Sequence, residues 1–173
     1  MMSDKILVAF ATRYGSTAEV AEKIAATLRE SGAVVDVRPV REVRSLNEYS
    51  TVVLGAPLYI GSWHEEAHRF LTTQHEALVG RSVAIFGLGP LSTSAEEMEG
   101  SRAQLDKELA KYPWLKPVAV EMFVGKYDPS KLSFAHRLIA VLPASPLHGL
   151  PASDNRDWEA IQAWASELPV QAG

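Results

Sequence analysis

Two hydrophobic periods alternate along this chain, and this alternation constrains the fold more than any other feature. Short apolar runs are typical of strands buried in a parallel sheet, and apolar residues three to four apart are typical of helices. The strand-like runs are residues 6–11, 33–40, 51–57, 81–88 and 117–124. The helix-like stretches are residues 17–32, 63–78, 94–111 and 156–168. Such alternation predicts right-handed crossovers with helices on both faces of the sheet.

The expected fold class is therefore α/β, a doubly wound five-stranded parallel sheet in three layers. Its strand order is expected to be 2-1-3-4-5, and residues 41–50 form one turn or a loop between the second and third strands. A chain of 173 residues is near the usual size of one domain, so we expect a single domain over residues 1–173. In such a fold, ligands bind beyond the carboxyl ends of the strands, which here directs attention to the loops starting near residues 12, 57 and 87.

Composition excludes several classes of chemistry. The chain has no cysteine, which excludes thiolate catalysis, disulfides and cysteine-ligated iron–sulfur clusters, so redox chemistry would need a bound cofactor. A net charge of −4 without a dense cluster of Lys and Arg argues against nucleic acid as a partner. No apolar run reaches the roughly 18 to 20 residues of a membrane span, and the N-terminus does not resemble a secretory leader. We expect a cytoplasmic protein with at most peripheral membrane contact.

The loop between the first strand and the first helix is the strongest candidate site. It reads Thr12-Arg13-Tyr14-Gly15-Ser16-Thr17. Backbone N–H groups, a helix N-terminus and three hydroxyls would converge there on one point, an arrangement that binds phosphate. The loop lacks the lysine of a Walker sequence and the glycine triplet of a dinucleotide site, so it predicts a monophosphate. The alternative is an ordinary helix cap without a ligand.

A zinc-protease motif also occurs, because residues 64–68 read His-Glu-Glu-Ala-His. In that motif two histidines one helical turn apart bind the metal. A third ligand at metzincin spacing would fall on Gln74, with His75 one position late, although a more distant Glu remains an alternative. Helical geometry offers a simpler interpretation, an amphipathic helix whose histidines lie at the border of its apolar face. We therefore predict no metal, and His64 remains a candidate contact for a cofactor or substrate.

The first strand and loop resemble the signature of the flavodoxin family. The matching residues are Val8, Phe10, Thr12, Gly15, Thr17 and Ala21. Ala9 is a mild departure from the pattern. Less specific features are similar to the branch of flavodoxin-domain proteins that includes menaquinone-dependent protoporphyrinogen dehydrogenase. These features are Gly55-Ala56, Ile60-Gly61, His64, Gly125 and Tyr127.

The resemblance implies that FMN is the cofactor and that its ring lies between the loops after the third and fourth strands. The residues expected at the ring are Pro57, Leu58, Tyr59, Ile60, Gly61, Gly87, Leu88, Gly89, Pro90 and Leu91. The peptide of Gly61 could turn to present a carbonyl to the reduced ring, and a simple turn glycine is the alternative. The flavin would carry the chemistry, so no catalytic side chain is expected.

Two features favour an oxidoreductase over an electron carrier. The loop at residues 87–94 contains no aromatic residue, whereas carriers of the flavodoxin family commonly cover both sides of the ring with aromatics. The carriers are also strongly acidic, and this chain is not. The expected partner is a small-molecule redox substrate or a protein redox partner, and the resemblance implies a quinone or a porphyrinogen. The alternatives are an electron-transfer protein without its own substrate and a domain independent of FMN; the oligomeric state is not predicted.

About thirty residues separate the fifth strand from the last helix, and we interpret residues 126–155 as an accessory insertion. Apolar residues there predict a helix closed by Pro143, with Leu132, Phe134, Leu138, Ile139, Val141 and Leu142. Such a helix adds to the core or forms a docking surface for a membrane or a lipophilic substrate.

Overall fold

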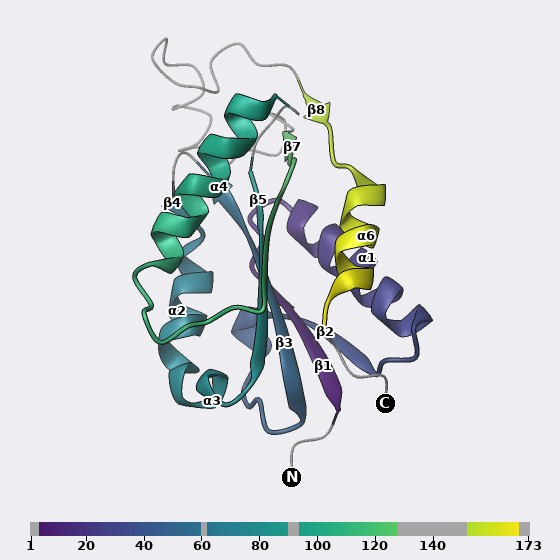
Figure 1. Ribbon diagram of the computed structural model, residues 1–173, viewed down its shortest axis with the longest axis vertical. Helices are drawn as coiled ribbons and strands as arrows, with labels where there is room; N and C mark the ends of the chain where they lie inside the picture. Colours follow the sequence, from purple (N-terminus) through teal and green to yellow (C-terminus); the bar gives the residue numbers. More distant parts are fainter. Residues whose placement is uncertain (1–3, 60–61, 90–93, 128–151, 170–173) are drawn as a thin grey trace.

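The computed structural model describes residues 4–59, 62–89, 94–127 and 152–169. Five parallel strands form the central sheet in the order β2-β1-β3-β5-β6 (Figure 1). They are β1 (Lys5–Phe10), β2 (Val35–Pro39), β3 (Tyr49–Tyr59), β5 (Ser82–Leu88) and β6 (Ala119–Phe123). The two-residue strand β4 (Ser62–Trp63) pairs antiparallel with the end of β3. Counted without β4, the strands have the predicted order 2-1-3-4-5, which confirms the fold class.

Helices cover both faces of the sheet, as Figure 1 shows. One layer consists of α1 (Ser16–Glu30) and α6 (Trp158–Glu167). The opposite layer consists of the 3₁₀ turn η1 (Val40–Glu42), α2 (Glu65–Thr73), α3 (His75–Val79) and α4 (Ala95–Leu109). The predicted three-layer arrangement is therefore confirmed. Every helix in the described ranges is too short or too polar to cross a bilayer.

Strand β1 shows why the strand sequences are continuously apolar. Its side chains alternate between the two faces, so that Ile6 and Val8 pack beneath α1 and α6. Leu7 and Ala9 point to the other face and join the core formed with η1, α2 and α4. Because both faces are covered, every position of β1 after Lys5 is buried and carries an apolar side chain.

Two elements differ from the sequence-based prediction. Strand β3 continues to Tyr59 rather than ending at Pro57, because Leu58 and Tyr59 pair with β4 in a short hairpin. The helix expected over residues 63–78 is divided at Gln74 into α2 and α3. Trp63, expected on that helix, belongs to β4, where its indole N–H donates to the Ala56 carbonyl oxygen at 3.1 Å.

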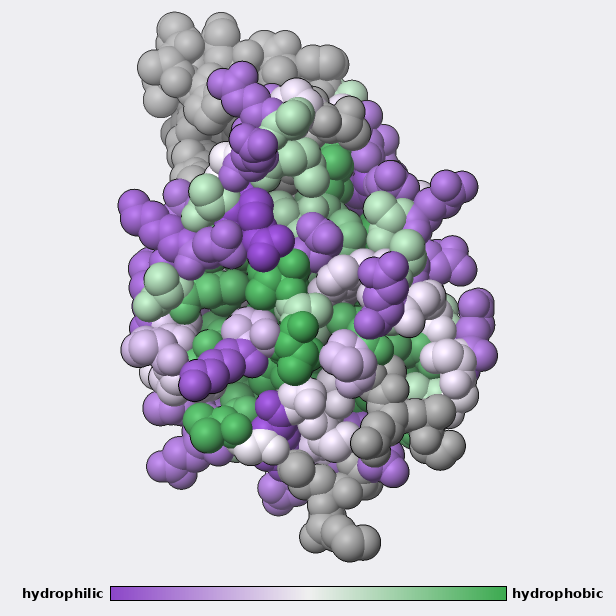
Figure 2. All heavy atoms as spheres, in the orientation of Figure 1, coloured by the Kyte–Doolittle hydropathy of each residue, from purple (hydrophilic) through white to green (hydrophobic). Residues whose placement is uncertain are grey.

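The predicted insertion begins and ends in a second, two-stranded sheet. Strands β7 (Lys126–Tyr127) and β8 (Ser153–Asp154) pair antiparallel. The helix predicted within residues 132–142 lies outside the described residues. Figure 2 shows the face on which β6 forms the edge of the main sheet, with apolar side chains gathered between the two helix layers and polar ones around them. The exposed surfaces of the helices are thus mainly polar, as their amphipathic patterns predict.

Candidate functional site

The loop between β1 and α1 is built around a left-handed glycine. Gly15 has φ 90°, a conformation that side chains disfavour, and it is the N-cap residue of α1. Its N–H donates to Thr12 Oγ1 at 2.9 Å, which closes the loop on itself. The Ala11 N–H donates to the Gly55 carbonyl oxygen of β3 at 2.9 Å and holds the start of the loop on the sheet. Thr12 Oγ1 accepts here, so its own hydroxyl hydrogen is still available to a ligand.

Thr17, in the first turn of α1, has an unsatisfied hydroxyl. The residue is fully buried, and its Oγ1 has no hydrogen-bond partner within the described ranges. In the part of the chain that the structure describes, no side chain caps α1, although the first N–H groups of a helix have no partner inside it. A buried polar group without a partner costs about 1–3 kcal/mol. Donors of this kind at a helix N-terminus suit an anion.

His64 brings the loop after β3 close to the charge of Arg13. It is the N-cap of α2, where its Nδ1 accepts from the Glu66 N–H at 3.1 Å, so that Nε2 carries the proton of the neutral ring. Its own backbone N–H donates to the Pro57 carbonyl oxygen at 3.1 Å. Burial lowers the pKa of His64, and the positive charge of Arg13 lowers it further. The ring is therefore held neutral near the candidate phosphate loop.

The end of β3 and the segment that follows β5 lie close together at the same edge of the sheet. A side chain on Gly89 would come within 3.2 Å of Leu58 Cβ, so the absence of a side chain allows these two segments to approach closely. The Gly89 N–H donates to the Phe123 carbonyl oxygen at 3.1 Å. Gly87 and Leu88, expected at the flavin ring, form the end of β5, and the Leu88 side chain is buried in the core beneath α1.

The structure describes only some of the other residues expected at the flavin ring. Pro57 is half-buried at the end of β3, and Tyr59 is placed by its backbone alone. Ile60, Gly61, Pro90 and Leu91 lie outside the described residues. The described part of the chain thus brings the loop at residues 12–17 and the ends of β3 and β5 to one edge of the sheet.

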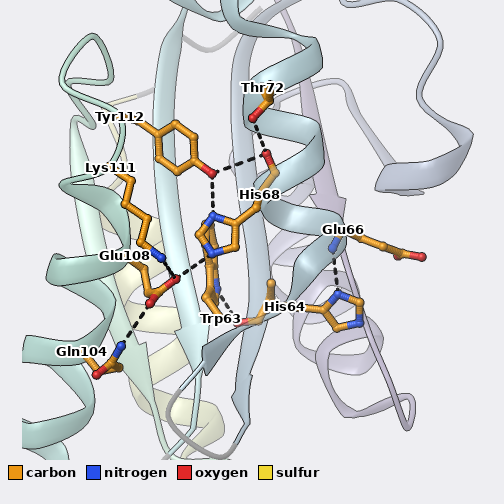
Figure 3. A network of polar contacts seen from close by, with 10 residues as sticks. Trp63, His64, Glu66, His68, Thr72, Gln104, Glu108, Lys111 and Tyr112 are labelled. Carbon is orange, nitrogen blue, oxygen red and sulfur yellow. Dashed lines mark hydrogen bonds and ion pairs between the residues drawn. The ribbon is translucent and has the colours of Figure 1, made fainter.

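The histidines of the zinc-like motif point to different sides of α2 (Figure 3). His68 Nε2 lies 2.7 Å from Glu108 Oε2, and its Nδ1 lies 2.5 Å from the Tyr112 hydroxyl oxygen. Both ring nitrogens are therefore engaged between α2 and the end of α4. Among the described residues, no group of three potential metal ligands comes together. His68 thus packs between α2 and the end of α4, whereas His64 caps the start of α2.

The sequence analysis missed Arg156, which lies between β8 and α6 and contacts the first turn of α1. Its side chain is only 3% exposed. It donates to both carboxylate oxygens of Asp154, each at 2.8 Å, and to the Ser16 carbonyl oxygen at 3.3 Å. No local pattern reveals such a contact, because Arg156 and Ser16 are 140 positions apart.

The comparison with protein families identifies the fold more specifically. The model of the flavodoxin domain matches residues 7–147, which is most of the chain. The chain belongs to the flavodoxin-domain family. The matched residues include most of β1, the loop at residues 12–17 and α1. Family membership supports a flavin-binding redox protein.

Curated relatives and solved structures agree with the family. Protoporphyrinogen IX dehydrogenase [quinone] of Escherichia coli K12 is 28% identical over 172 residues, covering 95% of this chain and 94% of the relative. A short-chain flavodoxin associated with a bacterial microcompartment superposes with a TM-score of 0.62 at 18% identity, over the whole of both chains. Oxidised flavodoxin 1 of Bacillus cereus gives a TM-score of 0.53 at 20% identity, covering 94% of this chain and 95% of that chain. These structural likenesses concern the fold alone.

Proposed function

We propose that this protein is an FMN-dependent oxidoreductase whose loop at residues 12–17 holds the FMN phosphate. The observation that carries the proposal is the buried hydroxyl of Thr17, which has no partner among the described residues and lies at the N-terminus of α1, where no described side chain forms a cap. A phosphate oxygen would accept from this hydroxyl and from the free N–H groups of the first turn. Bound FMN would supply the redox chemistry by taking electrons from one substrate and passing them to another.

The residues of the loop would divide the work of binding. Thr12 and Ser16 would donate hydroxyl hydrogens to the phosphate, and Gly15 would let the backbone turn around it. Arg13 and Tyr14 would border the site. The absence of a Walker lysine and of a glycine triplet favours a monophosphate over a triphosphate or a dinucleotide.

The flavin ring would lie at the edge of the sheet between the ends of β3 and β5. Pro57, Leu58, Tyr59, Ile60 and Gly61 would flank it on one side. On the other side Gly87, Leu88, Gly89 and Pro90 would offer mainly backbone groups. The close approach of Gly89 to Leu58 supports a common site for the two segments.

We assign a quinone or a porphyrinogen as the substrate class. The support is the E. coli relative, which aligns along nearly its whole length and is named as a protoporphyrinogen IX dehydrogenase acting with a quinone. The lack of aromatic residues at positions 87–94 also favours an open ring face on which a flat substrate could stack. We further propose one domain over residues 1–173, with residues 126–155 as an accessory insertion.

An electron-transfer protein without its own substrate is the second candidate. Membership of the flavodoxin-domain family favours it, because that fold is compatible with electron transfer between proteins. Stopped-flow mixing of the photoreduced, FMN-loaded protein with a soluble quinone separates the two candidates. Rapid, saturable oxidation of the flavin supports the oxidoreductase. Oxidation only by a protein partner, with well-separated one-electron steps in a redox titration, supports the carrier.

The placement of the phosphate is tested by Thr17→Ala. We expect FMN affinity, measured by quenching of flavin fluorescence, to fall about 10- to 100-fold because a charge-assisted hydrogen bond is lost. Thr17→Ser retains the hydroxyl and is expected to stay within about threefold of the wild type.

Thr27→Ala is the matched control, because Thr27 is also buried on α1 but donates to the Lys23 carbonyl oxygen. FMN affinity should not change in this variant. Unchanged FMN affinity in Thr17→Ala would refute the proposed phosphate site. Failure of the wild-type protein to bind FMN at all would refute the proposed function.

A further inference from the structure

Arg156 is a buried arginine at the first turn of α1, and the flavodoxin signature does not include it. Its guanidinium lies over the Trp158 ring at 4.7 Å, which covers one face of the group. Asp154 binds it through two parallel hydrogen bonds at 2.8 Å and thereby sets its orientation. Hydrogen bonding to Arg156 also lowers the pKa of the Asp154 carboxyl, so the pair remains charged at neutral pH.

The other donors of Arg156 reach α1. Nη1 donates to the Ser16 carbonyl oxygen at 3.3 Å, and Nη2 lies 3.4 Å from Glu19 Oε2. Among the described residues, the guanidinium thus donates to one backbone carbonyl and to two carboxylates, whose negative charges more than balance its own. Arg156 is placed to orient the start of the helix rather than to bind an anion itself.

The contact with Ser16 has a geometric consequence at Thr17. The Ser16 carbonyl and the Thr17 N–H belong to one planar trans peptide unit, so they point in opposite directions. An arginine that holds the carbonyl oxygen therefore directs the Thr17 N–H away from the helix, toward the side on which an anion would bind. A cationic donor also polarises the peptide and makes its N–H a stronger donor. Thr17 is the same residue whose buried hydroxyl has no partner within the described ranges.

We propose that Arg156 is a positioning residue of the phosphate site, which fixes the Ser16–Thr17 peptide so that the Thr17 N–H faces the FMN phosphate. This inference rests on the proposed function. It also gives the return strand of the predicted insertion a role, because β8 carries Asp154 and leads directly to Arg156. Asp154 and Arg156, near the C-terminus, thereby help to orient a phosphate loop that lies near the N-terminus, at residues 12–17.

The experiment compares the affinities of FMN and riboflavin, which differ only in the phosphate. Arg156→Lys keeps the charge but loses the planar fork, and Asp154→Asn weakens the orientation of the fork. We expect each variant to lose about tenfold in FMN affinity, because one charge-assisted contact is disturbed, and to keep riboflavin affinity within about twofold. Fluorescence quenching gives both constants, and thermal unfolding without flavin verifies that each variant folds.

Arg81→Lys is the matched control. Arg81 also donates to backbone carbonyl oxygens, those of Tyr49 and Ala77, at the opposite end of β3. This variant should bind FMN as the wild type does. A selective loss of FMN affinity in Arg81→Lys would overturn the inference, because arginine replacement in general would then account for the effect.

Two further results would overturn the inference. Equal losses of FMN and riboflavin affinity would mean that Arg156 supports the fold and not the phosphate site. Wild-type FMN affinity in both Arg156→Lys and Asp154→Asn, with reduced affinity in Thr17→Ala, would reject the role of Arg156 and retain the proposed function. If neither those variants nor Thr17→Ala changes FMN affinity, the proposed phosphate site itself fails.

Discussion

Glu108 is a buried residue whose charge depends on its neighbours. It lies near the end of α4, and its carboxylate is contacted by His68, Lys111 and Gln104 (Figure 3). Burial alone would raise the pKa of Glu108, but the hydrogen bonds from Lys111 and His68 outweigh it and the net pKa is lowered. The ionised form is thus favoured in the folded protein. This network holds α2 against α4 one helical turn after His64 along the chain.

The lowered pKa of Glu108 predicts a stability effect with a defined pH range. A carboxyl whose pKa is depressed by folding stabilises the protein above its unfolded pKa, near 4.5, and this contribution is lost as the pH falls through the folded pKa. We expect Glu108→Gln to reduce the free energy of unfolding by about 1–2 kcal/mol at pH 7 and to have little effect in strong acid. Urea unfolding at a series of pH values measures this difference.

Asp106→Asn is the control on the same helix. Asp106 pairs with Arg102, but both side chains are about half exposed, so water screens the interaction. Its loss should cost less than about 0.5 kcal/mol. A pH-independent cost for Glu108→Gln would contradict the assignment, since it would then reflect packing rather than charge.

At the scale of elements, strand and helix glycines play opposite roles. Gly55, in β3, lies under the ring of Phe86, and a Cβ atom there would come within 1.8 Å of Phe86 Cζ. Phe86 is fully buried, so its ring has little space into which it can move. Gly100, in α4, has open space around the position of a Cβ atom. Gly55 is required by the packing of the core, whereas Gly100 only lowers the stability of α4.

This contrast predicts opposite signs for the same substitution. Gly55→Ala should destabilise the protein by about 1–3 kcal/mol through overpacking of the core. Gly100→Ala should stabilise it by about 0.5–1 kcal/mol, because alanine is the better helix former. Chemical denaturation of both variants provides the comparison. A tolerated alanine at position 55 would show that the Phe86 ring can move, contrary to the close packing of this core.

For the whole molecule, the candidate site joins elements from distant parts of the chain at one edge of the sheet. The loop after β1, the ends of β3 and β5 and the segment before α6 converge there. FMN bound at this edge would be released on unfolding, so binding should stabilise the entire fold. With FMN at about 100 times its dissociation constant, the gain is about 2.7 kcal/mol.

We expect such a gain to raise the midpoint of thermal unfolding by roughly 5–10 °C for a chain of this length. Scanning fluorimetry with and without FMN measures the shift, and Thr17→Ala should reduce it at the same FMN concentration. A midpoint that does not respond to FMN would contradict the proposed cofactor.

Local patterns were sufficient to predict the strands, the helices and the hydroxyl-rich turn between β1 and α1, since period and turn chemistry act between near neighbours. The strand order followed from the usual order of a five-stranded doubly wound sheet. Pairing between distant residues had no such signal. The strand hydrogen bonds that extend β3 to Tyr59, the partners of His68 on α4 and the contact of Arg156 with Ser16 all depend on which segments the fold places together. The sequence by itself determined the βα units and their hydroxyl-rich loop. Only the tertiary structure decided which distant charges support that loop, because burial and orientation arise when the layers pack.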